Sequence, residues 1–208
     1  MKRILLLVLS ALVLFTACNK EKLAVIVRDA DGYGCTDTET GIHYTALPPA
    51  FEVAKSSTAR GAYTNEKTGA THTYYEIPSL DPARYLCDDE QTVWCAEDTL
   101  PEAKALTPVA LLICEEAAIS VEVMRFSVTD DAATFAALLA LWFDGEATQR
   151  PEGEMSYTYR VKMTSEELPN IFYCFSYAVW GEEAYFYDLF SKRAVLVPGA
   201  LADKFPSK

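Results

Sequence analysis

The chain has 208 residues, of which half are hydrophobic and 12% aromatic, and its 30 acidic and 18 basic side chains give a formal net charge of −12. This hydrophobic content excludes an intrinsically disordered chain, and the acidic balance argues against nucleic acid or anionic lipid headgroups as partners. The length suffices for one domain with a full core or for two small ones.

The first segment has the layout of a secretory signal peptide. Lys2 and Arg3 form a positive start, residues 4–15 form an uncharged apolar stretch, and the small residue Ala17 closes it. A membrane-spanning helix needs about 20 apolar residues, so this stretch is too short to be one.

A cysteine stands where the signal peptide is expected to end. The segment Phe15-Thr16-Ala17-Cys18 resembles the lipobox of bacterial lipoproteins, with Phe15 in place of the usual leucine. The resemblance implies diacylglyceryl transfer to the Cys18 sulfur, cleavage before Cys18 and an anchor of two or three acyl chains, which holds a protein stably on a membrane. It predicts a lipid-anchored protein on the extracytoplasmic face of the cell membrane. The alternatives are a signal anchor and a soluble secreted protein with an incidental cysteine.

Cleavage at this point (removing residues 1–17) leaves 191 residues, and the loss of two basic side chains changes the formal charge from −12 to −14. Residues 18–22 are then a short lipidated tether, and residues 23–208 form the extracytoplasmic domain. Residues 99–108 are the best candidate for a boundary between subdomains, and a loop inside one domain is the alternative.

Alternating apolar and polar residues predict mainly antiparallel strands. The alternation is clearest over residues 154–163, while residues 171–180 are apolar on both faces and indicate a central strand followed by a turn at Gly181-Glu182. Shorter strands are expected at residues 23–28, 42–45, 73–77 and 109–114. The apolar positions of residues 119–128 change phase, which predicts a β-bulge near Val123-Met124.

One helix is expected at about residues 130–143, capped by Thr129-Asp130 and ended by Asp144-Gly145. It is apolar nearly all round, because Ala136, Leu139 and Phe143 share one face and Phe135, Leu138 and Trp142 share the next. We therefore expect it to be buried against a sheet lined by Tyr157, Tyr159 and Val161. With a second short helix at residues 198–204, the predicted fold class is α+β.

Residues 29–40, DADGYGCTDTET, partly match a calcium-binding loop. Asp29, Asp31, Gly34 and Asp37 fit the template, but Tyr33 occupies a ligand position and Thr40 replaces the bidentate glutamate. A polar loop rich in Asp and Gly is the favoured interpretation.

The related segments TDTETGIHY from Thr36 and TNEKTGATHTY from Thr64 indicate either a duplication or, as we favour, two hairpin turns of the same chemistry.

His43 and His72 are the only histidines, and a zinc site would need both together with a carboxylate such as Glu76. Nothing in their spacing requires this, so no metal-binding, cofactor-binding or catalytic residue is predicted. Five cysteines remain beside Cys18, and Cys87 and Cys95 flank a predicted hairpin, where a disulfide or two free thiols are both open.

Aromatic residues are dense between Tyr157 and Phe190. Most are expected in the core, but Trp180, Tyr185 and Tyr187 lie near a turn, and an exposed row of such rings would suit a carbohydrate or peptide.

Residues 75–87 (YEIPSLDPARYLC), SVTDDA before the helix and the closing PGALADKF resemble uncharacterised lipoproteins of Firmicutes-type bacteria. That resemblance implies no known activity. The leading hypothesis is a non-enzymatic lipoprotein that binds an envelope protein or glycan. A binding module built on the aromatic strands is the second, and a hydrolase of envelope polymers is the third.

Overall fold

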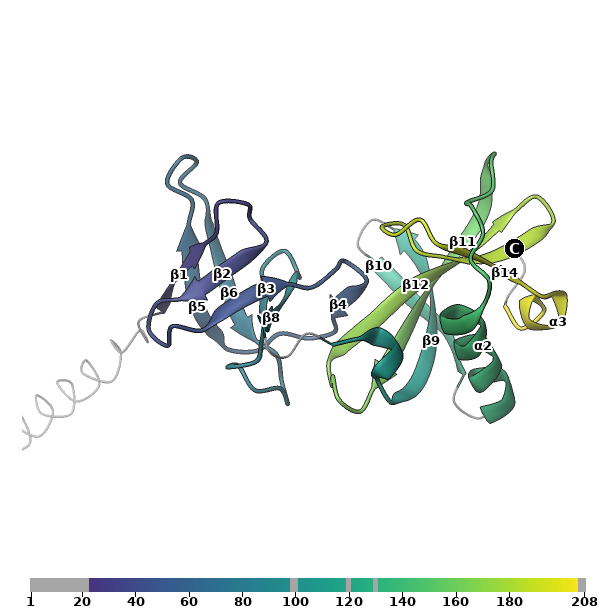
Figure 1. Ribbon diagram of the computed structural model, residues 1–208, viewed down its shortest axis with the longest axis horizontal. Coiled ribbons are helices and arrows are strands. Elements are labelled where there is room, and N and C mark those ends of the chain that lie inside the picture. The colour runs from purple at the N-terminus through teal and green to yellow at the C-terminus, as the bar shows by residue number, and fades with distance from the viewer. Residues whose placement is uncertain (1–22, 98–100, 119–120, 129–130, 206–208) are drawn as a thin grey trace, which may run out of the picture.

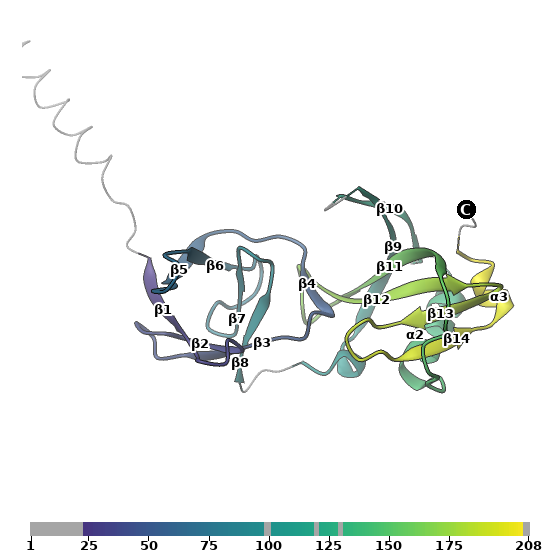
Figure 2. The same ribbon diagram turned by 90° about the horizontal axis from the view of Figure 1, so that it is seen from above.

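The computed structural model describes residues 23–97, 101–118, 121–128 and 131–205. The chain forms two lobes that lie side by side (Figures 1 and 2). The N-terminal lobe is a closed β-barrel, and the C-terminal lobe is a larger β-sheet with one long helix against it.

The barrel closes because its first strand pairs with strands on both sides. Neighbouring strands run antiparallel except β1 and β5, which are parallel, and closure leaves no free edge in this lobe. Gly61 permits this closure, since a Cβ atom there would lie 2.8 Å from the Ile26 side chain and 2.9 Å from the Ala24 carbonyl oxygen. In spatial order the strands are β1 (Ala24–Arg28), β2 (Gly34–Asp37), β3 (His43–Ala46), β8 (Val93–Ala96), β7 (Tyr85–Asp88), β6 (Thr71–Glu76) and β5 (Ala59–Thr64).

The two related segments of the sequence form two hairpin turns of the same design. In the turn between β2 and β3, Asp37 Oδ1 accepts hydrogen bonds from the amides two and three residues further on, those of Glu39 and Thr40, and Gly41 has a φ of 73°. In the turn between β5 and β6, Asn65 Oδ1 does the same and Gly69 has a φ of 71°. Shared turn chemistry therefore accounts for the likeness of the two segments.

The C-terminal sheet contains six strands in the order β10-β9-β11-β12-β13-β14, and a seventh, β4 (Phe51–Val53), pairs with β12. Because β4 precedes β5 in the chain, the N-terminal half contributes a strand to the other lobe. The remaining bounds are β9 (Pro108–Ala118), β10 (Val121–Val128), β11 (Met155–Ser165), β12 (Ile171–Trp180), β13 (Glu183–Tyr187) and β14 (Ala194–Val197), with a short 3-10 helix η2 (Ala103–Ala105) before β9.

A shared apolar cluster joins the lobes. Leu47, Phe51 and Ile77 from the N-terminal half pack with Leu168 and Ile171 from the C-terminal half, and all five are buried. The Asn170 side-chain amide also donates a hydrogen bond of 2.9 Å to the Pro78 carbonyl oxygen, and the Cys174 amide donates to the Ala50 carbonyl oxygen at 2.7 Å. Hydrophobic contact and backbone hydrogen bonds thus fix β4 against β12.

The expected α+β class is wrong, because strands make up 46% of the chain and helices 13%. The long helix α2 (Ala132–Asp144) is present, but only Leu138 and Trp142 in it are buried. All five of its alanines face solvent. The expectation of a fully buried helix counted alanine as a core residue, although its single methyl group gains little from burial. The C-terminal helix α3 (Gly199–Ala202) is one turn long.

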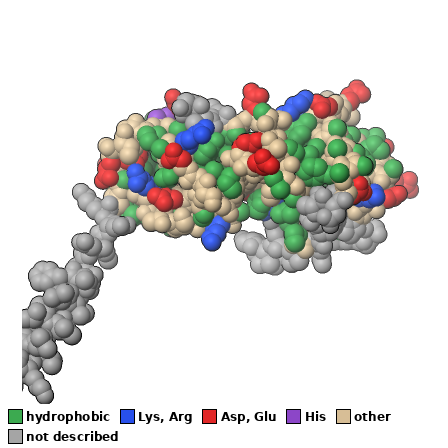
Figure 3. Space-filling view, turned by 90° about the horizontal axis from the view of Figure 1, so that it is seen from below, with side chains coloured by type: hydrophobic (Ala, Val, Ile, Leu, Met, Phe, Trp, Pro, Cys, Tyr) green, Lys and Arg blue, Asp and Glu red, His purple; other side chains and the backbone are tan. Residues whose placement is uncertain are grey.

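Several local expectations are confirmed. Residues 171–180 form a central strand between β11 and β13, and the pairing of β9 with β10 is irregular between Met124 and Phe126, close to the predicted bulge. The predicted cap Thr129-Asp130 lies outside the described residues, and in the structure Asp131 caps α2 by accepting a hydrogen bond from the Thr134 amide at 3.0 Å. In Figure 3, charged side chains are interspersed over the barrel, and hydrophobic ones are more frequent over the sheet.

Candidate functional site

The lipidation site Cys18, the signal peptide of residues 1–17 and the tether of residues 18–22 lie outside the described residues. The membrane anchor therefore stays a prediction. No helix among residues 23–97, 101–118, 121–128 and 131–205 has the length and hydropathy needed to cross a bilayer.

The partial calcium-loop match does not form a cation site. Asp29 Oδ2 lies 2.9 Å from His43 Nε2, Asp31 Oδ1 accepts the Tyr33 amide at 2.9 Å, and the buried Asp37 caps the next turn. The three carboxylates thus serve three different partners. Gly34 is needed for the first pair, because a Cβ atom there would lie 2.0 Å from Asp29 Oδ2.

The two histidines are not brought together. His43 is on β3 and His72 on β6, with β8 and β7 between them in the barrel. His43 Nδ1 lies 2.9 Å from Glu97, and His72 Nδ1 lies 3.3 Å from Asp89. The hydrogen bond to Asp29, together with the nearby charges of Asp29 and Glu97, outweighs slight burial and raises the pKa of His43. In the part of the chain that the structure describes, no three His, Cys, Asp or Glu side chains are grouped to hold a metal ion.

The aromatic strands do not present an exposed row. Trp180, Tyr185 and Tyr187 are 6%, 8% and 6% exposed, and they pack together with Ala178 and Ala194 on one face of the sheet. The rings of Tyr185 and Tyr187 both meet the Trp180 ring edge to face, at 5.8 and 5.6 Å between centroids. These residues build a core, as expected of most aromatics in this segment, and leave no stacking platform for a sugar.

The five cysteines in the described residues are buried, and none of them forms a disulfide. Cys87 lies opposite Val93 and Cys95 lies opposite Tyr85, so the two predicted hairpin cysteines are out of register for a cross-strand pair. Burial raises the pKa of Cys87 to about 11, which keeps its thiol protonated and unreactive.

A buried ion pair inside the barrel was not anticipated from the sequence. Arg28 Nη2 donates to Asp88 Oδ2 at 3.0 Å, and Arg28 Nε donates to the Tyr74 hydroxyl at 2.7 Å. Trp94 Nε1 donates to the same carboxylate oxygen at 3.1 Å, and the guanidinium lies 5.3 Å from the Trp94 ring centroid. The Asp88 side chain is fully buried, and a buried carboxylate is stable only when it is paired and hydrogen-bonded. Arg28 and Trp94 provide these interactions. The cluster joins β1, β6, β7 and β8 inside the barrel.

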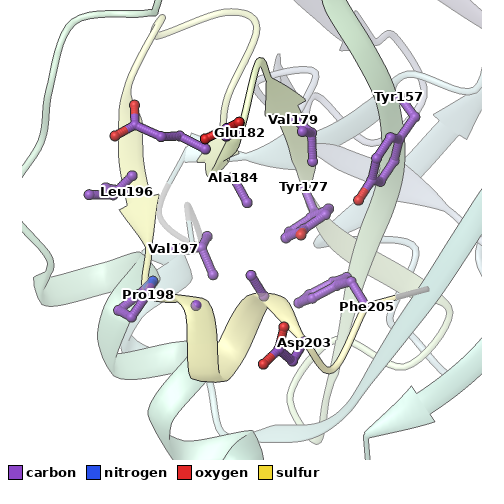
Figure 4. A pocket seen from close by; sticks show the side chains of 13 residues that line it. Tyr157, Tyr177, Val179, Glu182, Ala184, Leu196, Val197, Pro198, Asp203 and Phe205 are labelled. Carbon is purple, nitrogen blue, oxygen red and sulfur yellow. The ribbon is translucent and has the colours of Figure 1, made fainter. Parts of the chain in front are cut away.

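The best candidate site is a hollow at the far end of the sheet lobe, between β11, β12, β13, β14 and α3, which we call the C-terminal pocket (Figure 4). It has a volume of about 490 Å³, within the range of small-molecule sites. Figure 4 shows side chains from these elements pointing into one space. Its lining residues are Tyr157, Tyr177, Val179, Glu182, Glu183, Ala184, Leu196, Val197, Pro198, Gly199, Ala202, Asp203 and Phe205.

The floor of the C-terminal pocket is rigid and aromatic. Tyr177 and Phe205 stack at 3.9 Å between centroids with 4° between their planes, and both are buried. Burial, the hydrogen bond with Tyr157 and the charge of Asp203 all raise the pKa of Tyr177 above its usual value. Burial therefore keeps the Tyr177 hydroxyl neutral.

Carboxylates are the charged groups at the rim. Glu182 and Asp203 are exposed, and Glu183 Oε2 accepts a hydrogen bond of 2.6 Å from the Tyr185 hydroxyl. That hydrogen bond raises the pKa of Tyr185. The lining contains three acidic residues and no basic one, so the local field favours a cation.

A second hollow of about 430 Å³ lies where the lobes meet, between β4, α2 and the hairpin joining β13 to β14. Its lining is mostly apolar, and its two charged side chains already have partners. Arg193 Nη2 donates to the Trp142 and Gly145 carbonyl oxygens at 2.7 and 3.1 Å, and Asp188 accepts the Phe190 amide at 3.0 Å. This junction groove therefore offers little polar chemistry to select a ligand.

Sequence reasoning placed Tyr157 and Tyr177 in the sheet core and did not connect them with residues 198–205. The one feature of the sequence that could have indicated the pocket is the acidic pair Glu182-Glu183 beside an aromatic strand. The pocket itself forms only because the chain returns to the sheet at α3.

Comparisons of the chain with protein-family models, with curated proteins and with solved structures give no match.

Proposed function

We propose that this protein is a lipid-anchored, extracytoplasmic binding protein that holds a small ligand in the C-terminal pocket without catalysis. The observation that carries the binding role is the pocket itself, in which an apolar aromatic floor meets a few convergent polar groups. The lipobox-like segment ending at Cys18 supports the anchored location.

The geometry gives the hydrolase hypothesis less support. General acid–base chemistry by histidine requires the ring within hydrogen-bond reach of a nucleophile or substrate proton. His43 and His72 instead contact carboxylates on separate strands of the barrel, and neither lines the C-terminal pocket. The buried aromatic face likewise gives no support to a carbohydrate module on Trp180 and its neighbours.

A pocket-filling substitution tests the location of the site. Ala202 lines the C-terminal pocket, so Ala202→Trp should occupy the space that a ligand needs. Ala136 lies on the exposed face of α2 and lines no described hollow, so Ala136→Trp is a matched control.

Both variants and the wild type would be screened by NMR against one library of small polar–apolar compounds. We expect hits for the wild type and Ala136→Trp, and loss of those hits for Ala202→Trp, with a cooperative thermal transition in each variant showing that it is folded. Hits that bind Ala202→Trp as well as they bind the wild type would show that the site lies elsewhere.

A further inference from the structure

The lining of the C-terminal pocket also defines the chemical class of its ligand. Resting on the proposed function, we infer that the pocket binds an organic ammonium compound, with the cationic group at the acidic rim and a hydrocarbon or aromatic part on the Tyr177–Phe205 floor.

The charges around the pocket are of one sign. Glu182 comes from the turn before β13 and Asp203 from the end of α3, so carboxylates lie on two sides of the hollow (Figure 4). Glu183, the first residue of β13, also lines the pocket, but its carboxylate accepts the hydrogen bond from the Tyr185 hydroxyl. Lys204 directly follows Asp203 in the chain, but it does not line the pocket. Its Nζ lies 3.9 Å from Asp131 Oδ2. An anionic ligand would therefore meet repulsion and find no compensating cation in the lining.

The hydroxyl oxygens of Tyr157 and Tyr177 supply further acceptors in the lining. A phenolic hydroxyl both donates and accepts hydrogen bonds, so each of the two tyrosine oxygens can accept from a ligand. An ammonium group has only donors, so such oxygens suit it. The Tyr157 ring is partly exposed at the same place, and an aromatic face attracts a cation within about 6 Å of its centroid.

An inorganic cation fits this arrangement less well. Calcium takes six to eight oxygen ligands, whereas no group of three metal-binding side chains occurs in the parts of the chain that the structure places. Nine of the thirteen lining residues are apolar or aromatic, including Val179, Ala184 and Val197. A bare ion would leave this apolar surface unused, while an organic ammonium compound covers it.

Three probes of the same carbon skeleton test the inference: phenylpropylammonium, phenylpropanol and phenylpropanoate. Dissociation constants would be measured by NMR titration of the full protein at low and at high salt. We expect the ammonium compound to bind about tenfold more tightly than the alcohol at low salt, the size of one or two partly exposed ion pairs, and the preference to shrink at high salt. The carboxylate compound should bind most weakly.

Substitutions at the rim provide the second arm. Asp203→Asn and Glu182→Gln keep the side-chain shapes and should each reduce the preference for ammonium over alcohol severalfold. Glu152→Gln removes an exposed carboxylate that does not line the pocket, and it should leave the preference unchanged.

The outcomes separate the two proposals. If the alcohol or the carboxylate compound binds as tightly as the ammonium compound, and Ala202→Trp abolishes that binding, the pocket is a site but the ammonium inference is wrong. An ammonium preference that survives in the Asp203→Asn, Glu182→Gln double variant would also overturn the inference. If Ala202→Trp leaves the binding of every probe unchanged, the proposed function of the pocket is itself overturned.

Discussion

Leu138 offers the sharpest test of how α2 packs. It is 1% exposed in the main cluster of the sheet lobe, while its neighbour Leu139 is only partly buried at the edge of that cluster. The sequence predicts that both leucines are buried, whereas in the structure only Leu138 is fully buried. Replacing each by alanine therefore compares two chemically identical changes one residue apart on the same helix.

The expected magnitude follows from the burial. Leucine to alanine removes three carbon groups, about 2.4 kcal/mol at about 0.8 kcal/mol each, and the remaining cavity raises the loss toward the upper end of a range of about 2–5 kcal/mol. Leu138→Ala should lose this amount, and Leu139→Ala should lose less than half as much. Both changes alter helix propensity equally, so the difference between them reports burial alone.

Urea denaturation of the wild type and the two variants measures these losses, with the unfolding slope checked for a constant value. Equal losses for the two variants would refute the assignment of faces on α2. A larger loss for Leu139→Ala would show that the helix is rotated relative to the sheet.

Three further predictions concern the anchor, the histidine pair and the partial calcium loop. Cys18→Ser should abolish incorporation of labelled palmitate and release the protein from membranes or leave it as a precursor; undiminished labelling would contradict the lipoprotein proposal. Because the pKa of His43 is raised in the folded state, the stabilisation it provides is present below its unfolded pKa of about 6.5 and is lost as pH rises through the folded value. The stability difference between wild type and His43→Gln should accordingly be larger at about pH 5 than at about pH 9, and a difference that does not change with pH would be evidence against the Asp29 and Glu97 contacts. Millimolar calcium should leave the melting temperature unchanged, because Asp29, Asp31 and Asp37 already serve other partners; an EGTA-reversible rise that disappears in Asp29→Ala would prove this wrong.

Local patterns predicted individual elements well and their assembly poorly. The two-residue alternation found β11, and the apolar run of residues 171–180 found β12, because each signal lies within one strand. Barrel closure depends on the pairing of Ala24 with Gly61, which are far apart in the chain. A local hydrophobic pattern cannot predict such a pairing. Short strands such as β4 were missed because three residues carry too little pattern to recognise.

The candidate site shows the same limit. Asp203 and Phe205 stand near the C-terminus and the tyrosines stand on the sheet, so the C-terminal pocket exists only after α3 folds back over β12 and β13. The helix was misjudged for a different reason. Its alanines satisfied an apolar pattern, but packing energy depends on side-chain size, and the larger residues Leu138 and Trp142 determine which face is buried.

A crystal structure of the protein with bound phenylpropylammonium tests the central claim most directly. We predict the compound in the C-terminal pocket, with its phenyl ring against the Tyr177–Phe205 floor and its nitrogen within about 3 Å of a carboxylate oxygen of Asp203 or Glu182. Density for the compound in the junction groove or on the barrel, with the C-terminal pocket unfilled, would contradict the assignment of this pocket as the binding site.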